Sequence, residues 1–227
     1  RPEQAGFRRG KSCTDQVFAL RQIIEQCLEW NTMLYMNFID FQNEFDSIHG
    51  ESLWKILRHQ GIPVKIVDIV KMLYQSPKCK VICGSCTTES FHVTTGVKQG
   101  CLLSPLLFVL KVDWIMKETT KGKRRGIRWT LASVLEDLDY ADDVDLLSSR
   151  HQDMQEKTNK FKETAEKVGL KIHPKKTKVM KINSNRSEPI KIGEEDVEEV
   201  ESFDYLGSRV TKDGDAEKDV DARLSKA

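Results

Sequence analysis

The sequence predicts an α+β fold in which helices back one face of a small antiparallel sheet. The segment LYMNFIDF at 34–41 is dense in apolar and aromatic residues and contains no Gly or Pro, which is typical of a buried strand. The elements expected along the chain follow the order strand, helices, hairpin, helix, strand pair, helix, strand, which favours this class. With 227 residues, 39% apolar and 31% charged, the chain can bury a sizeable core.

The first helix is expected at 13–29. Ser12 can cap it, with Asp15 three residues further on. One apolar stripe then recurs at helical spacing, made of Val17, Leu20, Ile24 and Leu28. The buried strand at 34–41 follows and carries Asp40 close to its end.

The middle of the chain predicts two short helices, a hairpin and an apolar helix. The two helices cover about 51–60 and 63–75, with Gly61 as C-cap and Pro63 at a helix start. The segments KVICG and SFHVTTG predict strands that pair across a turn rich in cysteine. Ser104-Pro105 predicts an N-cap followed by the first helical position of a helix that runs to about residue 117.

The second half begins with a basic loop or hairpin at 120–130 and continues with the aspartate-rich stretch LEDLDYADDVDLL. Ser149 and Gln152 predict a capping box for a helix that Gly169 ends. A short strand is expected at 178–182, and FDYLGSRV predicts a strand or hairpin at 203–210. The charged end of the chain looks like the start of another helix.

Charge and cysteine content place few limits on function. Lys and Arg number 36 against 35 Asp and Glu, so net charge does not indicate a nucleic-acid binder. The longest apolar run, LLSPLLFVL, is too short to span a bilayer. Cys83 and Cys86 have C-x-x-C spacing with Cys79 nearby, but no partner pair completes four zinc ligands. A hairpin tip is the alternative for CGSC. The chain does not begin with Met, so we expect a piece of a longer protein.

Asp142 and Asp143 are the centre of the chemical prediction. If the apolar segments around them are strands, the pair lies at a tight hairpin turn, where a divalent cation would offset the repulsion. Asp40 ends another buried strand and could join them, as in a two-metal site. A solvated turn is the alternative for the pair alone. Alternation places Asp137 and Asp139 on the wetter face of their strand, and Asp145 on the face of Asp143.

Five blocks in this order and spacing carry a resemblance to a known family. They are the first strand with its D-x4-F-D continuation, GVKQGCLLSP at 96–105, YADD at 140–143, VGLKIHPKKT at 168–177 and FDYLG at 203–207. Together they resemble the palm of a reverse transcriptase, most closely the RTE/LINE-like enzymes of non-LTR retrotransposons. QAGFRRGKSCTDQVFALRQIIE also resembles that family's segment between fingers and palm.

The resemblance implies a domain organisation. Residues 1–33 would be partial fingers. Residues 34–200 would be the palm, with a fingers contribution between the first strand and the 96–105 loop. Residues 201–227 would form the primer-grip hairpin and the start of a truncated connection to the thumb. An endonuclease upstream and a thumb downstream are expected in the parent chain.

The resemblance also implies roles for single residues. Asp40, Asp142 and Asp143 match the catalytic metal-binding aspartates, with the Phe41 carbonyl as a further metal ligand. Phe45 matches the aromatic residue under the incoming sugar, where a ring leaves no room for a 2′-hydroxyl, although a core phenylalanine is the alternative. A second set matches the nucleotide-binding loops and a lysine near the leaving pyrophosphate: Gln99, Gly100 and Lys176, with Lys175 as a rival to Lys176.

The implied partners are an RNA template, a DNA primer and dNTPs. Tyr205, Leu206 and Gly207 belong to the block that resembles the primer grip. The basic loop supplies expected phosphate contacts, for which plain solvation is the alternative: Lys121, Lys123, Arg124, Arg125 and Arg128. The implied cofactor is two Mg²⁺ ions, which Mn²⁺ can replace. An intracellular protein of cytoplasm and nucleus is expected, with no membrane partner.

Three residues depart from the family pattern. Glu44 stands where Ala is usual, Asp145 where a small or apolar residue is usual, and His173 where Asn is usual. Glu44 and Asp145 add negative charge near a site that must accept a triphosphate, as in a decayed element copy. A palm-like remnant that folds or binds nucleic acid without catalysis is therefore the alternative function. A P-loop in AGFRRGKS is disfavoured, because Ala5 stands where the first Gly is required.

Overall fold

A five-stranded sheet forms the centre of the molecule. The computed structural model describes residues 1, 3–42, 50–75, 78–92, 96–97, 100–130 and 133–225. The sheet order is β15-β12-β1-β10-β9, and β12 and β15 are its one parallel pair among these residues. The bounds are β1 (Leu34–Ile39), β9 (Asp137–Tyr140), β10 (Asp143–Ser148), β12 (Lys178–Ile182) and β15 (Glu198–Glu199).

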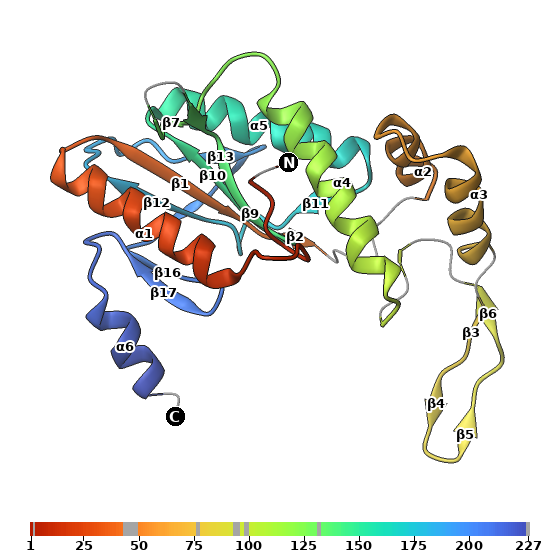
Figure 1. Cartoon of the computed structure of the whole chain (residues 1–227). Helices are drawn as coiled ribbons and strands as arrows, with labels where there is room; N and C mark the ends of the chain where they lie inside the picture. The colour runs from red at the N-terminus through yellow and green to blue at the C-terminus, as the bar shows by residue number, and fades with distance from the viewer. Residues whose placement is uncertain are drawn as a thin grey trace.

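Helices cover both faces of this sheet (Figure 1). On one face α1 (Cys13–Glu29) packs Leu20 and Ile24 against Met36 and Phe38 of β1. On the other face α4 (Leu103–Thr120) and α5 (His151–Lys167) enclose the larger core, which takes the alternate β1 residues, among them Ile39. The α+β class is confirmed, but the expectation of helices on one face is wrong. β1 is buried along its whole length, so both of its faces need cover.

Three short helices and six two-stranded pairs among the described residues lie outside the central sheet. The helices α2 (Gly50–His59) and α3 (Val64–Leu73) lie beside α4, and α6 (Glu217–Leu224) follows the last hairpin. The remaining strands pair two by two: β2 (Phe41–Gln42) with β11 (Lys171–Ile172), β3 (Lys78–Cys79) with β6 (Phe91–His92), β4 (Ile82–Cys83) with β5 (Cys86–Thr87), β7 (Ile127–Arg128) with β8 (Val134–Leu135), β13 (Lys191–Ile192) with β14 (Glu195–Asp196), and β16 (Ser202–Tyr205) with β17 (Ser208–Thr211).

Local signals predicted most element boundaries. The capping box of Ser12 and Asp15 is present at the start of α1. Gly61 and Gly169 have positive φ just after α2 and α5, as expected of residues that end helices. Cys83 of β4 lies opposite Cys86 of β5 in the strand register, so CGSC is a hairpin tip.

Two predicted helix caps are wrong. Ser104 lies inside the first turn of α4, buried, and its hydroxyl lies 3.1 Å from the hydroxyl of Tyr74. Helix α5 begins at His151, with Arg150 as N-cap and no side-chain cap. The hydroxyl near that helix start belongs to Ser148, which accepts a hydrogen bond from the Arg150 N–H at 3.4 Å.

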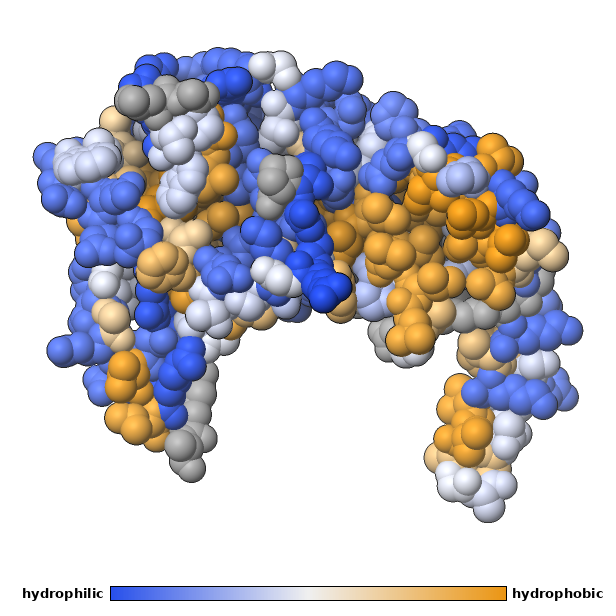
Figure 2. Space-filling view, in the orientation of Figure 1, coloured by the Kyte–Doolittle hydropathy of each residue, from blue (hydrophilic) through white to orange (hydrophobic). Residues whose placement is uncertain are grey.

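The molecule has the outline of an arch (Figure 2). The long hairpin from β3 to β6 forms one leg, α6 and the β16–β17 hairpin form the other, and the underside between them is hollowed. β2 and β9 lie at the middle of this underside (Figure 1). Within the described part of the chain, no helix is both long and apolar enough to cross a bilayer.

Candidate active site

Strand register brings Asp40 and Asp143 together. β1 pairs with β10 so that Ile39 lies opposite Val144, and the next position along places Asp40 beside Asp143. Both aspartates line a small hollow of about 120 Å³, which is also lined by Lys176, Phe203 and Tyr205. The structure thus joins the first strand block, the YADD block and the FDYLG block at one place.

Asp142 and Asp143 lie at a tight hairpin turn, as predicted. Tyr140 pairs with Asp143, which leaves Ala141 and Asp142 as a two-residue loop between β9 and β10. Ala141 has φ +60°, a value that costs free energy for any residue except glycine. A positive φ at the first of two loop residues is the type II′ pattern, which usually has Gly there. The turn between β9 and β10 is therefore strained at Ala141.

Electrostatic repulsion is concentrated on Asp143. Desolvation by the surrounding protein, together with the charges of Asp142 and Asp40, raises the pKa of Asp143 to about 6. Its side chain is nevertheless open to solvent at the start of β10. A carboxylate that is accessible and crowded by two others gains from a bound cation, which would lower its pKa.

The 168–177 block holds Asp40 in place. The backbone N–H of His173 donates to the Asp40 carbonyl at 2.8 Å, and the N–H of Asp40 donates to the Thr177 hydroxyl at 3.2 Å. The Nζ of Lys176 lies 3.7 Å from Oδ1 of Asp40, and the lysine side chain is 64% exposed. This lysine is therefore close to the carboxylates and free to move toward a substrate.

The residues present suit a hard divalent cation, although the site is incomplete. Oδ1 of Asp40 is buried and has no hydrogen-bond partner among the described residues. Carboxylate oxygens are the ligands that Mg²⁺ and Mn²⁺ prefer. No group of three His, Cys, Asp or Glu side chains in the described ranges converges closely enough to hold a metal ion by itself. The carboxylates fit a cation that also takes oxygen ligands from substrate or water.

Asp145 lies in the protein interior. Burial raises the pKa of Asp145 well above its ordinary value, opposed by the charge of Lys157. Neither carboxyl oxygen makes a hydrogen bond of good geometry in the part of the chain described, although the Asn37 backbone lies close enough to favour the charged form. Asp145 is not among the groups that raise the pKa of Asp143. It shares a strand face with Asp143, as predicted, but it lies in the interior, away from solvent.

The prediction that Asp137 and Asp139 face solvent is wrong. Both side chains are buried, with 1% and 0% exposure. Arg1 forms ion pairs with both, and its guanidinium lies 3.2 Å from Asp139. The N-terminal segment runs beside β9 and covers the edge and the face that the alternation pattern left open. The N-terminal segment, which is distant in the sequence, thus buries the face of β9 that carries Asp137 and Asp139.

Several predicted nucleotide contacts remain predictions. Phe45, Gln99 and the departing Glu44 lie outside the described residues. Gly100 has φ +81°, where glycine is favoured. The ring of Phe41 packs edge-on to Phe108 at 6.1 Å between centroids, so only its backbone is available to a metal.

The FDYLG block forms a hairpin beside the aspartates. Tyr205 is 2% exposed, and its ring lies 5.8 Å from that of Phe38. Leu206 and Gly207 form the turn, both with positive φ. The turn is therefore the accessible part of this hairpin, and Tyr205 is its buried support.

The basic loop lies far from the aspartates. The Arg125 carbonyl accepts a hydrogen bond from Ser148, at the opposite end of β10 from Asp143. Five residue steps along a strand correspond to about 17 Å. Lys123 and Arg125 are also paired with acidic residues of α5. The structure does not bring these cations together with the carboxylates.

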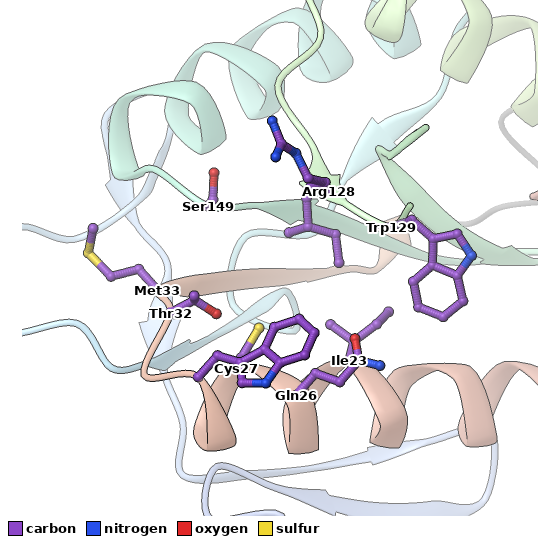
Figure 3. A pocket seen from close by; sticks show the side chains of 10 residues that line it. Ile23, Gln26, Cys27, Thr32, Met33, Arg128, Trp129 and Ser149 are labelled. Atoms are coloured by element: carbon purple, nitrogen blue, oxygen red, sulfur yellow. The ribbon is translucent and has the colours of Figure 1, made fainter. Parts of the chain in front are cut away.

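Arg128 of this loop instead lines an apolar hollow (Figure 3). The hollow lies between the C-terminal half of α1 and β7, and Trp30 and Trp129 form part of its wall. It has a volume of about 290 Å³. Sequence reasoning did not find it, because the two tryptophans are 99 positions apart.

An antiparallel sheet that carries paired aspartates on a strained hairpin turn beside a third strand-end aspartate is the architecture of a nucleotide-polymerase palm. The sequence profile described as "Reverse transcriptase (RNA-dependent DNA polymerase)" matches residues 1–210, so the chain belongs to the reverse transcriptase family. This family is one of RNA-dependent DNA polymerases, and membership implies dependence on a divalent metal ion.

The relatives are polyproteins of retrotransposable elements, in keeping with a non-LTR retrotransposon domain. The Pol polyprotein of the type-2 retrotransposable element R2DM of Drosophila melanogaster is 28% identical over 177 residues, which cover 77% of this chain and 16% of that protein. The Pol polyprotein of a type-1 R2 element of Nasonia vitripennis is 24% identical over 188 residues, 77% of this chain and 18% of that protein. The chain thus spans less than a fifth of these two relatives.

Solved structures show the same fold. Telomerase of Candida albicans, in a complex with a fragment of telomeric RNA, superposes with a TM-score of 0.62. The match covers 92% of this chain and 34% of that chain at 14% identity. Truncated apo telomerase of Candida tropicalis gives a TM-score of 0.60 over 94% of this chain and 40% of that chain, at 16% identity.

Proposed function

We propose that this chain is the catalytic palm of a retrotransposon polymerase that extends a DNA primer on an RNA template. The observation that carries the proposal is the meeting of Asp40 and Asp143 at the strained YADD turn. The primer 3′-hydroxyl would attack the α-phosphate of a dNTP, and pyrophosphate would leave. Two Mg²⁺ ions, replaceable by Mn²⁺, would lower the pKa of that hydroxyl and balance charge on the triphosphate.

The chain's own residues would position these groups. Asp40, Asp142 and Asp143 supply carboxylate oxygens, and the Phe41 carbonyl is a further proposed ligand. Lys176 is close enough to Asp40 to serve the leaving pyrophosphate, since its exposed Nζ lies 3.7 Å from that carboxylate. The hollowed underside of the arch, with β2 and β9 at its middle, is the proposed seat of the template–primer (Figures 1 and 2).

Primer extension with the longest protein that carries this chain tests the proposal. An RNA template, a DNA primer, dNTPs and Mg²⁺ should give extension, and Asp142→Asn should abolish it. Asp196→Asn is the matched control, because Asp196 is an exposed aspartate in the separate β13–β14 hairpin. Extension by Asp142→Asn at the parent's rate would contradict the metal-site assignment.

Sugar selection is a second test of the same site. We propose that Phe45 excludes a 2′-hydroxyl, so Phe45→Val should raise ribonucleotide incorporation relative to deoxyribonucleotide incorporation. Unchanged discrimination would assign Phe45 to the core.

The non-catalytic remnant is the competing function, favoured by Glu44 and His173, which depart from the family pattern. Such a remnant would bind a template–primer without extending it under Mg²⁺ or Mn²⁺. The burial of Asp145 counts against one argument for that alternative, because it keeps this departure out of the reaction centre.

A further inference from the structure

The N-terminal segment contacts the catalytic turn directly. Gln4 forms a parallel bridge with Asp139, and the Ala5 N–H donates to the Asp139 carbonyl at 2.9 Å. The segment therefore runs along the outer edge of β9 and reaches Ala141 at the end of that strand. Sequence reasoning used Ala5 to reject a P-loop and included Gln4 and Gly6 in the block that resembles the segment between fingers and palm, but it gave neither residue a role of its own.

The side chain of Gln4 recognises the backbone of Ala141. Its Oε1 accepts hydrogen bonds from the Ala141 N–H at 3.0 Å and from the Gly6 N–H at 2.7 Å. Its Nε2 lies 3.5 Å from the Ala141 carbonyl, to which it donates. Gln4 is 2% exposed, so these contacts are shielded from water. The Gln4 amide thus forms hydrogen bonds with both backbone polar groups of Ala141, as the backbone of a neighbouring strand would.

Gly6 is required by close approach to the same residue. A Cβ at position 6 would lie 2.3 Å from the Ala141 nitrogen and 2.7 Å from its Cα. Both atoms belong to the backbone, so relief requires the turn itself to move. The absence of a side chain at Gly6 thus allows the N-terminal segment to press against the turn.

The contacts of Gln4 and Gly6 matter because the backbone of Ala141 is strained. A non-glycine residue with positive φ costs about 1–3 kcal/mol and persists only when its surroundings hold it. Ala141 immediately precedes Asp142 and Asp143, so a relaxed turn would move both carboxylates. A displacement of about 1 Å at a reaction centre can cost on the order of 100-fold in rate.

We propose that Gln4 and Gly6 are positioning residues that brace the YADD turn and hold Asp142 and Asp143 in their reactive arrangement. The effect on catalysis rests on the function proposed above. The effect on the turn does not, because it concerns the metal-free backbone alone.

Hydrogen exchange on the longest protein that carries this chain tests the brace. In Gln4→Met, which keeps the side-chain length but removes the amide, the Ala141 amide should exchange about fivefold faster without metal, because it loses one buried hydrogen bond. Gln16→Met is the matched control. Gln16 is also buried and donates to the carbonyls of Glu3 and Asp139, but it does not touch the turn.

Primer extension supplies the second readout. Gln4→Met should lower kcat about tenfold or more in Mg²⁺, leave KM for dNTP within about twofold, and regain part of the loss in Mn²⁺, since Mg²⁺ demands the more ideal geometry. Gly6→Ala should act in the same direction by displacing the turn, and it tests the proposal if Gln4→Met fails to fold.

The outcomes separate this proposal from the proposed function. Unchanged Ala141 exchange in Gln4→Met overturns the brace, and so does equal acceleration in Gln16→Met, which would show only a general loosening of the segment. If the unaltered protein extends no primer, the proposed function fails, while the exchange measurement still decides whether Gln4 holds the turn.

Discussion

The β9–β10 hairpin contains aspartates of two opposite kinds. At its turn, Asp142 and Asp143 are accessible to solvent, and repulsion from neighbouring carboxylates helps to raise the pKa of Asp143. Further along the same strands, Asp137, Asp139 and Asp145 are buried. The Arg1 guanidinium forms ion pairs with the first two, whereas Asp145 forms no ion pair among the described residues. The comparison teaches that position along a hairpin, more than residue type, separates reactive carboxylates from structural ones.

The largest expected effect comes from the open end of the hairpin, the turn where Asp142 and Asp143 are accessible to solvent. Asp143→Asn should lower kcat for primer extension by about 10³-fold or more, because metal-assisted charge stabilisation contributes several kcal/mol. Its melting temperature should not fall, since the change removes repulsion from Asp40 and Asp142. Extension kinetics and thermal unfolding of the same preparation measure both quantities. A stability loss equal to that of a buried-site variant would remove the distinction between the two ends.

The second-largest effect is expected at the buried end of the hairpin, the part with Asp137, Asp139 and Asp145, where the charge of Lys157 acts on Asp145. Lys157 is 1% exposed, donates to the carbonyls of Glu136 and Leu147, and forms an ion pair with Glu136 at 2.7 Å. Lys157→Met leaves these partners buried without a cation, so the free energy of unfolding should fall by about 3–5 kcal/mol. Denaturant titration measures the loss. Activity per folded molecule should stay near the parent value, and a specific loss of kcat would place Lys157 in the catalytic machinery.

Local signals in the sequence predicted the open end well. An Asp-Asp pair between two apolar strands indicates a turn, and the structure has Ala141 and Asp142 as its two loop residues. The meeting of Asp40 with Asp143 also followed from strand ends. Gln4 carried no comparable signal, because its contact with Ala141 spans 137 positions and depends on how the chain returns.

The buried end could not be predicted from alternation. The pattern correctly placed Leu138 on one face and Asp137 and Asp139 on the other, but it could not show that Arg1 would cover that other face. Burial of a charged residue depends on a partner from elsewhere in the chain. The basic loop shows the reverse case. Lys123 and Arg125 of that loop pair with acids of α5, which the local sequence did not indicate, and their contact with phosphates stays a prediction.

A smaller effect of opposite sign is expected at Asp145. Asp145→Val removes a buried carboxyl group for which the cost of desolvation outweighs the favourable effects of Lys157 and the Asn37 backbone, and it places a β-branched residue in a central strand. The free energy of unfolding should rise by about 1–3 kcal/mol. Denaturant titration checks this gain, and Asp145→Asn, which keeps the polarity, is the control. Destabilisation by Asp145→Val would mean that the carboxyl group has a stabilising partner.

The smallest expected effect is a pH dependence that belongs to the open end. The pKa of Asp143 is about 6 in the folded protein against 3.8 as its ordinary value. The folded state therefore holds this proton more tightly, so the stabilising contribution is complete below about pH 4 and is lost as pH rises through about 6. Asp143→Asn should flatten this part of the stability profile of the metal-free protein. The pKa values of Asp137, Asp139 and Asp145 are raised in the same direction, so the contribution of Asp143 is the difference between the stability profiles of the parent and of Asp143→Asn. In that difference, added Mg²⁺ should displace the proton of Asp143 and shift its transition to lower pH. A transition that ignores both Mg²⁺ and Asp143→Asn would belong to another group and would weaken the case for cation binding at the turn.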